Sequence, residues 1–87
     1  MIVSVKIINK AGLHARPAAA FVQLANKFKS QVKVKKDDIE VNGKSILGMM
    51  MLGASVDSKI TLKITGSDEK EMCEALIKLI SDKFNED

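Results

Sequence analysis

The amino-acid sequence predicts an α/β (α+β) fold, an open-faced β-sandwich in which a four-stranded antiparallel sheet carries three helices on one face. Three observations predict this fold. Four short segments alternate apolar with polar residues, as strands with one covered face do. Three other segments repeat apolar residues at helical spacing, which gives the order β-α-β-β-α-β-α. The 87 residues contain no linker, repeat or low-complexity tract, so we expect one domain, residues 1–87, with a single core.

The first predicted strand ends near Ile8 or Asn9, and a helical period is under way by Ala18. The strand alternates apolar with polar side chains, whereas the helix repeats apolar residues every three or four positions. Residues 10–16 between them form the connecting loop and the entrance of the helix. The apolar residues are Val3, Val5 and Ile7 in the strand, and Ala18, Phe21, Val22, Ala25 and Phe28 in the helix.

This loop contains the chain's only histidine and only proline, in the stretch GLHARP. Gly12 suits a sharp turn, because glycine adopts backbone angles that other residues resist. Pro17 suits the first turn of a helix, where its missing N–H would have had no intrahelical partner. We therefore expect His14 at or beside the N-cap, with its ring outside the helix.

The second and third strands follow, and the third ends at the turn pair Asn42-Gly43. The lysines of the second strand alternate with its valines, so we assign them to the solvated side and the end of that strand. The apolar residues are Val32 and Val34 in the second strand, and Ile39 and Val41 in the third.

Ser45 predicts the N-cap of a short helix that runs from Ile46 to about Leu52. This helix is apolar on every side, and a small core has room for only one of its faces. A partly exposed, methionine-rich helix favours a docking surface, with Leu47 and Met50 as its outward pair at i and i+3. A fully buried helix is the alternative.

The fourth strand and the last helix complete the predicted order. Asp68 can cap the helix, and Glu71 three positions later predicts a capping box. Cys73 is interpreted as a packed residue, and Asn85-Glu86-Asp87 as a frayed end. The apolar residues are Ile60, Leu62 and Ile64 in the strand, and Met72, Leu76, Leu79 and Ile80 in the helix.

Composition limits the possible functions. The formal net charge of +3 falls short of the basic excess typical of nucleic-acid binders, and the lysines have no interleaved aromatic residues to stack bases. A single cysteine cannot form an internal disulfide, which favours a reducing compartment. The apolar run of the N-terminal stretch MIVSVKIINK is too short for a signal peptide or a membrane span. We therefore predict a cytoplasmic protein that binds neither nucleic acid nor membrane.

The surroundings of His14 favour phosphoryl transfer. Neutral imidazole is a competent nucleophile near pH 7. A phosphoryl group on it would meet the free N–H groups and the positive dipole end of a helix, and Arg16 offers a guanidinium that matches phosphate oxygens. A polar surface histidine beside a solvated arginine is the ordinary alternative.

Other sites at His14 have less support. A metal site lacks a second histidine and has one cysteine, so we expect neither metal nor cofactor. A Ser-His-Asp triad stays open, although so small a chain offers little room for a substrate pocket.

The stretches GLHARPAAAFV and NGKSILGMMMLG together resemble the histidine-containing phosphocarrier protein family, HPr, of the bacterial phosphoenolpyruvate-dependent sugar phosphotransferase system. The resemblance covers essentially the whole chain, and the two motifs have the family's separation. It implies an open-faced β-sandwich with three helices. It also implies a carrier rather than an enzyme, because such a protein is itself the covalent intermediate.

The resemblance implies a role for each motif residue. His14 would be phosphorylated on Nδ1 by phospho-Enzyme I and would pass the group to sugar-specific IIA domains. Arg16 and Pro17 match the motif's arginine and helix-start proline. Leu47 and Met50 take positions similar to the family's partner-facing patch.

Ser45 matches the serine that HPr kinase/phosphorylase modifies with ATP in many Gram-positive members. In those bacteria, the modified form is a corepressor for a catabolite control protein. The alternative to a carrier is therefore a regulatory docking module that acts through Ser45 and the apolar patch. The presence of His14 disfavours the related regulatory paralogue, which lacks the active histidine. We expect a monomer, since transient docking needs nothing more.

Overall fold

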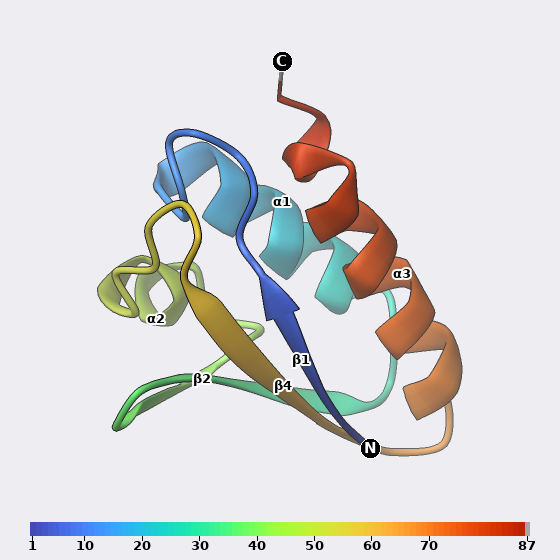
Figure 1. Ribbon diagram of the computed structural model, residues 1–87. Helices are drawn as coiled ribbons and strands as arrows, with labels where there is room; N and C mark the ends of the chain where they lie inside the picture. The colour runs from blue at the N-terminus through green and yellow to red at the C-terminus, as the bar shows by residue number, and fades with distance from the viewer. Residues whose placement is uncertain (87) are drawn as a thin grey trace.

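The computed structural model describes residues 1–86 and confirms the predicted fold (Figure 1). Four strands and three helices follow in the predicted order, with one further 3₁₀ turn at the end. These elements are β1 (Ile2–Lys6), α1 (Ala15–Ala25), β2 (Gln31–Lys36), β3 (Ile39–Asn42), α2 (Ile46–Met51), β4 (Lys59–Thr65), α3 (Glu69–Ser81) and η1 (Lys83–Asn85).

The sheet is antiparallel throughout, and its strand order is β1-β4-β2-β3. Val34 of β2 lies opposite Leu62 of β4 and Val41 of β3, so this register aligns apolar side chains on one face. Figure 1 shows α1 and α3 side by side over the sheet, with α2 packed beside α1. The helices thus cover one face and leave the other open.

One apolar core lies between the covered sheet face and the helices. Each large apolar side chain that is fully buried in this core stabilises the fold by about 1.5–3 kcal/mol. Cys73 is buried in α3 as predicted, and so are three residues of the predicted inward stripe, Met72, Leu76 and Ile80. The fourth, Leu79, packs against the core but is only partly buried. The largest fully buried side chains are Phe21, Ile7, Met49, Leu52, Ile60, Leu62, Ile64, Met72, Leu76, Ile80, Val32 and Val34.

Two predicted element ends differ from the structure. β1 ends at Lys6 rather than near Ile8, although Ile7 still donates a backbone hydrogen bond to Ser58. α1 ends at Ala25, after which i to i−3 hydrogen bonds tighten the chain into a turn. Phe28 therefore packs against the core from this turn rather than from the helix.

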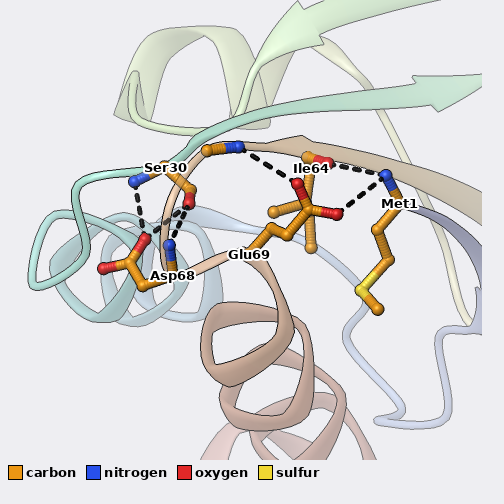
Figure 2. A network of polar contacts seen from close by, with 6 residues as sticks. Met1, Ser30, Ile64, Asp68 and Glu69 are labelled. Atoms are coloured by element: carbon orange, nitrogen blue, oxygen red, sulfur yellow. Dashed lines mark hydrogen bonds and ion pairs between the residues drawn. The ribbon is translucent and has the colours of Figure 1, made fainter.

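The predicted capping box of α3 is wrong. Asp68 is the N-cap residue, but its side chain makes no cap hydrogen bond. Its carboxylate instead accepts hydrogen bonds from the N–H groups of Lys29 (2.9 Å) and Ser30 (2.8 Å) and from the Ser30 hydroxyl. Ser30 is buried, so its polar groups need partners, and Figure 2 shows Asp68 supplying them.

Glu69, and not Glu71, reaches back over the start of α3. Its Oε1 accepts a hydrogen bond from the Gly66 N–H at 3.3 Å. Its Oε2 lies 3.4 Å from the terminal ammonium of Met1, which donates to the Ile64 carbonyl at 2.9 Å (Figure 2). These polar contacts join the end of β4, the start of α3 and the first residue of the chain.

No helix within residues 1–86 is both long and apolar enough to cross a membrane.

We predict that acid weakens the fold through Asp68. The Ser30 hydroxyl and then the Lys29 N–H lower the pKa of this carboxyl from 3.8 to about 2. A carboxyl whose pKa is lower in the folded state stabilises the fold above its unfolded pKa, and this contribution is lost as pH falls toward the folded pKa. The free energy of unfolding should therefore decline between about pH 4 and pH 2, and Asp68→Asn should flatten that decline. Urea unfolding at a series of pH values measures it.

The matched control is Asp38→Asn, because Asp38 is exposed in the β2–β3 turn. This variant should keep the wild-type decline. Equal pH dependence in Asp68→Asn and wild type would contradict the prediction.

Candidate functional site

His14 is the N-cap residue of α1, as predicted, with extended backbone angles of φ −83° and ψ −169°. Its carbonyl accepts the first helical hydrogen bond, from the Ala18 N–H at 3.0 Å. The imidazole makes no cap hydrogen bond, and 43% of the side chain is exposed. The ring therefore lies outside the helix, where a reactant can approach it.

The backbone on both sides of His14 is fixed by contacts with the core. Gly12 has φ +70°, and a Cβ there would lie 2.6 Å from the Ala54 carbonyl oxygen, so glycine is required. Leu13 is buried and donates to the same carbonyl at 2.8 Å. Pro17 is buried in the first turn of α1. The exposed histidine is thus held between two buried residues.

The amino end of α1 carries the positive end of the helix dipole. The N–H groups of Ala15 and Arg16 belong to the first turn, where N–H groups have no intrahelical acceptor. No acidic residue lies in this turn to neutralise the helix dipole. Arg16 is exposed two residues after His14. The structure therefore places an imidazole, free N–H groups and an exposed arginine residue at one helix entrance, which suits an anion.

Glu86 is the residue that sequence reasoning missed. Its Oε2 lies 3.1 Å from Nε2 of His14, and its Oε1 accepts a hydrogen bond from Nδ2 of Asn9 at 3.0 Å. Asn9 Nδ2 also donates to the Gly12 carbonyl at 2.8 Å. Glu86 is 72 residues from His14 in the sequence, yet only 14% of its side chain is exposed.

The interpretation of Asn85 and Glu86 as a frayed end is therefore wrong. Asn85 belongs to η1, which follows α3, and Phe84 within it is buried. The spacing offered a signal for this, because Phe84 continues the i to i+4 series of Leu76 and Ile80. Asp87, the last residue of the predicted frayed end, lies outside the described residues.

Ser45 caps α2 as predicted, with its Oγ accepting the Gly48 N–H at 3.0 Å. Met49 and Leu52 are buried in the core, whereas the opposite side of the helix is exposed. The fully buried alternative is therefore wrong. The exposed residues, which we call the α2 patch, are Ile46, Leu47, Met50 and Met51.

Both residues of the predicted outward pair of α2, Leu47 and Met50, are exposed, but the prediction left out Met51. Leu47 and Met51 are both 68% exposed, whereas Met50 is 43% exposed. Met51 lies at i+4 from Leu47, so these two share the outermost face of the helix.

The predicted site residues lie on two helices, α1 and α2, that pack against each other. α2 packs against α1, whose amino end carries His14 and Arg16, and the loops that precede α1 and follow α2 are joined by the hydrogen bond from Leu13 to Ala54. Among the described residues, Ser45 and His14 make no hydrogen bond to each other. In the same part of the chain, no group of three or more His, Cys, Asp and Glu side chains could hold a metal ion.

Comparisons with known proteins agree on one family. A family model described as PTS HPr component phosphorylation site matches residues 3–82. The chain is 52% identical to the phosphocarrier protein HPr of Neisseria meningitidis, over 95% of this chain and 93% of the relative. It is 53% identical to the HPr-like protein Crh of Halalkalibacterium halodurans, over 87% of this chain and 90% of the relative.

A solved structure of HPr from Thermoanaerobacter tengcongensis superposes with a TM-score of 0.95 at 52% identity, and the match covers 100% of this chain and 98% of the other. The order of strands and helices agrees between the two. The chain therefore belongs to the HPr family of phosphocarrier proteins.

Proposed function

We propose that this protein carries phosphoryl groups in a sugar phosphotransferase system, with His14 as the acceptor from phospho-Enzyme I and the donor to IIA domains. One observation carries the proposal: an exposed imidazole stands at the N-cap of α1, beside free N–H groups and Arg16. We propose further that the protein works in the cytoplasm as a monomer and turns over no substrate on its own.

The chemistry follows from this placement. A lone pair of the His14 ring forms a bond to phosphorus, while the bond between phosphorus and the donor atom of phospho-Enzyme I breaks and leaves its electron pair on that atom. The new dianion then faces the amino end of α1, an interaction worth about 0.3–1 kcal/mol at an exposed site. The exposed guanidinium of Arg16 can pair with the phosphate oxygens. These contacts are weak enough for the group to be passed on.

The α2 patch provides a docking surface next to this site. Its residues are flexible methionines and aliphatic side chains, which can adapt to unrelated partners. A carrier must bind Enzyme I and several IIA domains in turn, and each must bring its reactive group to His14. An apolar surface on the helix that packs against α1 meets this need.

Regulation through Ser45 is part of the proposal. A phosphate at this N-cap would be favoured by the dipole of α2 and could still accept the Gly48 N–H, so the fold should persist. It would add negative charge directly before Ile46 and Leu47. Such a change would require HPr kinase/phosphorylase and could create a site for a catabolite control protein.

A second candidate function is a regulatory docking module in which His14 is incidental. The observation that favours it is the likeness to the HPr-like protein Crh, together with the exposed α2 patch.

We predict that His14→Ala abolishes phosphoryl uptake. The ring contacts Glu86 at the surface and is not part of the core, so the fold should persist. The measurement is incorporation of labelled phosphate from phosphoenolpyruvate with Enzyme I, followed by tests of product stability in acid and alkali. Wild type should give acid-labile, alkali-stable phosphate. Uptake by His14→Ala at the wild-type level would refute the assignment. No uptake by wild type, with Enzyme I active on a control carrier, would favour the regulatory module, and His14→Ala should then still bind a catabolite control protein.

We predict that Leu47→Gln and Met51→Gln each weaken binding of Enzyme I by about 5- to 30-fold, since exposed apolar anchors contribute roughly 1–2 kcal/mol. Titration calorimetry measures the affinity. Ile2→Gln is the matched control, because Ile2 is 70% exposed but lies on the open face of the sheet. An equal loss in the control would show that apolar exposure in general, and not the α2 patch, governs docking.

We predict that Ser45→Asp weakens Enzyme I binding, whereas Ser45→Asn leaves it near wild type. Asp and Asn cap helices about as well as Ser, so both variants should keep thermal stability within about 0.5 kcal/mol. They differ in one negative charge at the edge of the α2 patch. Similar affinities for the two variants would contradict a charge-based control at this position.

A further inference from the structure

A chain of polar contacts runs from the core to the reactive ring. The amide of Asn9 donates both to the Gly12 carbonyl (2.8 Å) and to Oε1 of Glu86 (3.0 Å), and Oε2 of Glu86 lies 3.1 Å from Nε2 of His14. Asn9 is 0% exposed, and the side chain of Glu86 is 14% exposed. The exposed histidine is thus joined to a fixed internal group.

The direction of these hydrogen bonds is set by Asn9. A carbonyl oxygen and a carboxylate are both acceptors, so the amide nitrogen of Asn9 must face them. The reversed amide would place Oδ1 against two acceptors. In the observed orientation, Oδ1 is buried without a hydrogen-bond partner among the described residues. Leaving that atom unpaired is unfavourable, which shows that the contacts of the amide nitrogen dominate.

Glu86 therefore presents an acceptor to His14. An ionised carboxylate can only accept, so the ring nitrogen that faces it must carry a proton. Neutral imidazole has one N–H, which leaves the lone pair on Nδ1. We propose that Glu86, oriented by Asn9, is a positioning residue that holds His14 in its Nε2–H tautomer, which keeps the lone pair free on Nδ1, the acceptor atom that the family resemblance implies. The catalytic consequence rests on the proposed function, whereas the tautomer itself does not.

The same arrangement removes the need for a base. When the Nδ1 lone pair forms the bond to phosphorus, the bond from phosphorus to the donor breaks and the proton stays on Nε2. The ring becomes cationic at that step, and the Glu86 carboxylate beside Nε2 pairs with this charge. The reverse transfer returns the ring to the same neutral tautomer, ready for the next cycle.

The turn that precedes Glu86 has an unusual backbone conformation. Lys83, Phe84 and Asn85 all have positive φ, between 56° and 63°, which is a conformation that residues with a Cβ avoid. The buried side chain of Phe84 anchors this unfavourable turn. Glu86 follows the turn directly and reaches the β1–α1 loop. A strained turn that leads into a contact with the reactive ring is an arrangement typical of functional sites.

Replacing Glu86 with Gln should change the tautomer of His14. Asn9 donates into the position of Oε1, so the new carboxamide should place its oxygen there and its NH₂ group toward His14. An NH₂ group donates, so Nε2 would have to accept, and the proton would move to Nδ1. Glu86→Ala offers neither donor nor acceptor and should leave a mixture of tautomers. The nearly isosteric variant should therefore be the more damaging one.

The experiment is ¹⁵N NMR of the His14 ring at about pH 8.5, where an ordinary histidine is neutral. The full-length wild-type protein should show a protonated Nε2 and an unprotonated Nδ1. Glu86→Gln should shift the ring toward the Nδ1–H form, and Glu86→Ala should fall between them. Asp82→Asn is the matched control, since it removes an acidic group four residues before Glu86 that pairs with Lys78, and its spectrum should match wild type.

Phosphoryl uptake from phospho-Enzyme I provides the second readout. The rate should fall on the order of tenfold or more in Glu86→Gln, and less in Glu86→Ala, because the wrong tautomer lacks the accepting lone pair. A wild-type tautomer in Glu86→Gln would overturn the proposal, as would uptake that proceeds at the same measurable rate in wild type and both Glu86 variants. If the tautomers shift as expected but wild type takes up no phosphate, the positioning role of Glu86 stands and the proposed carrier function fails.

Discussion

The structure depends on one constraint, which is that a chain of this length can fill only a single apolar layer. Helices α1 and α3 cover one face of the sheet, and the central strand β4 contributes three fully buried side chains, Ile60, Leu62 and Ile64, to the layer. No second layer is left to cover the remaining apolar side chains. The core therefore fixes where α1 lies, and the amino end of α1 projects His14 beyond it.

The small size of the core also explains why one side of α2 is exposed. Met49 and Leu52 take the space available, so Leu47 and Met51 on the other side of the helix face solvent. A contiguous exposed apolar surface is unfavourable for an isolated protein and is typical of a surface that meets partners. The proposed docking surface and the proposed reactive site thus share an origin. Both lie where the elements extend past the layer that stabilises them.

Sequence patterns predicted what depends on neighbours along the chain. Alternation identified the strands, and the N-caps His14 and Ser45 followed from glycine, proline and serine at fixed offsets. The errors concern partners that are distant in sequence. Asp68 was expected to cap its own helix, but its carboxylate satisfies Ser30, which lies 38 residues away. Glu86 was expected to be frayed. The spacing of Phe84 indicates an ordered end of α3, but no local pattern indicates that the following residue contacts His14.

This division has a physical reason. Periodicity and capping reflect the geometry of one helix or strand, which a short stretch of sequence determines. A buried polar group takes whichever partner the fold brings near it, and that partner depends on the packing of every element. In a carrier site, the local pattern GLHARP can supply the nucleophile, the helix end and the guanidinium. The proposed control of the His14 tautomer depends on Asn9 and Glu86, which only the folded chain brings together. The groups proposed to react are therefore encoded locally, while their proposed control depends on the fold.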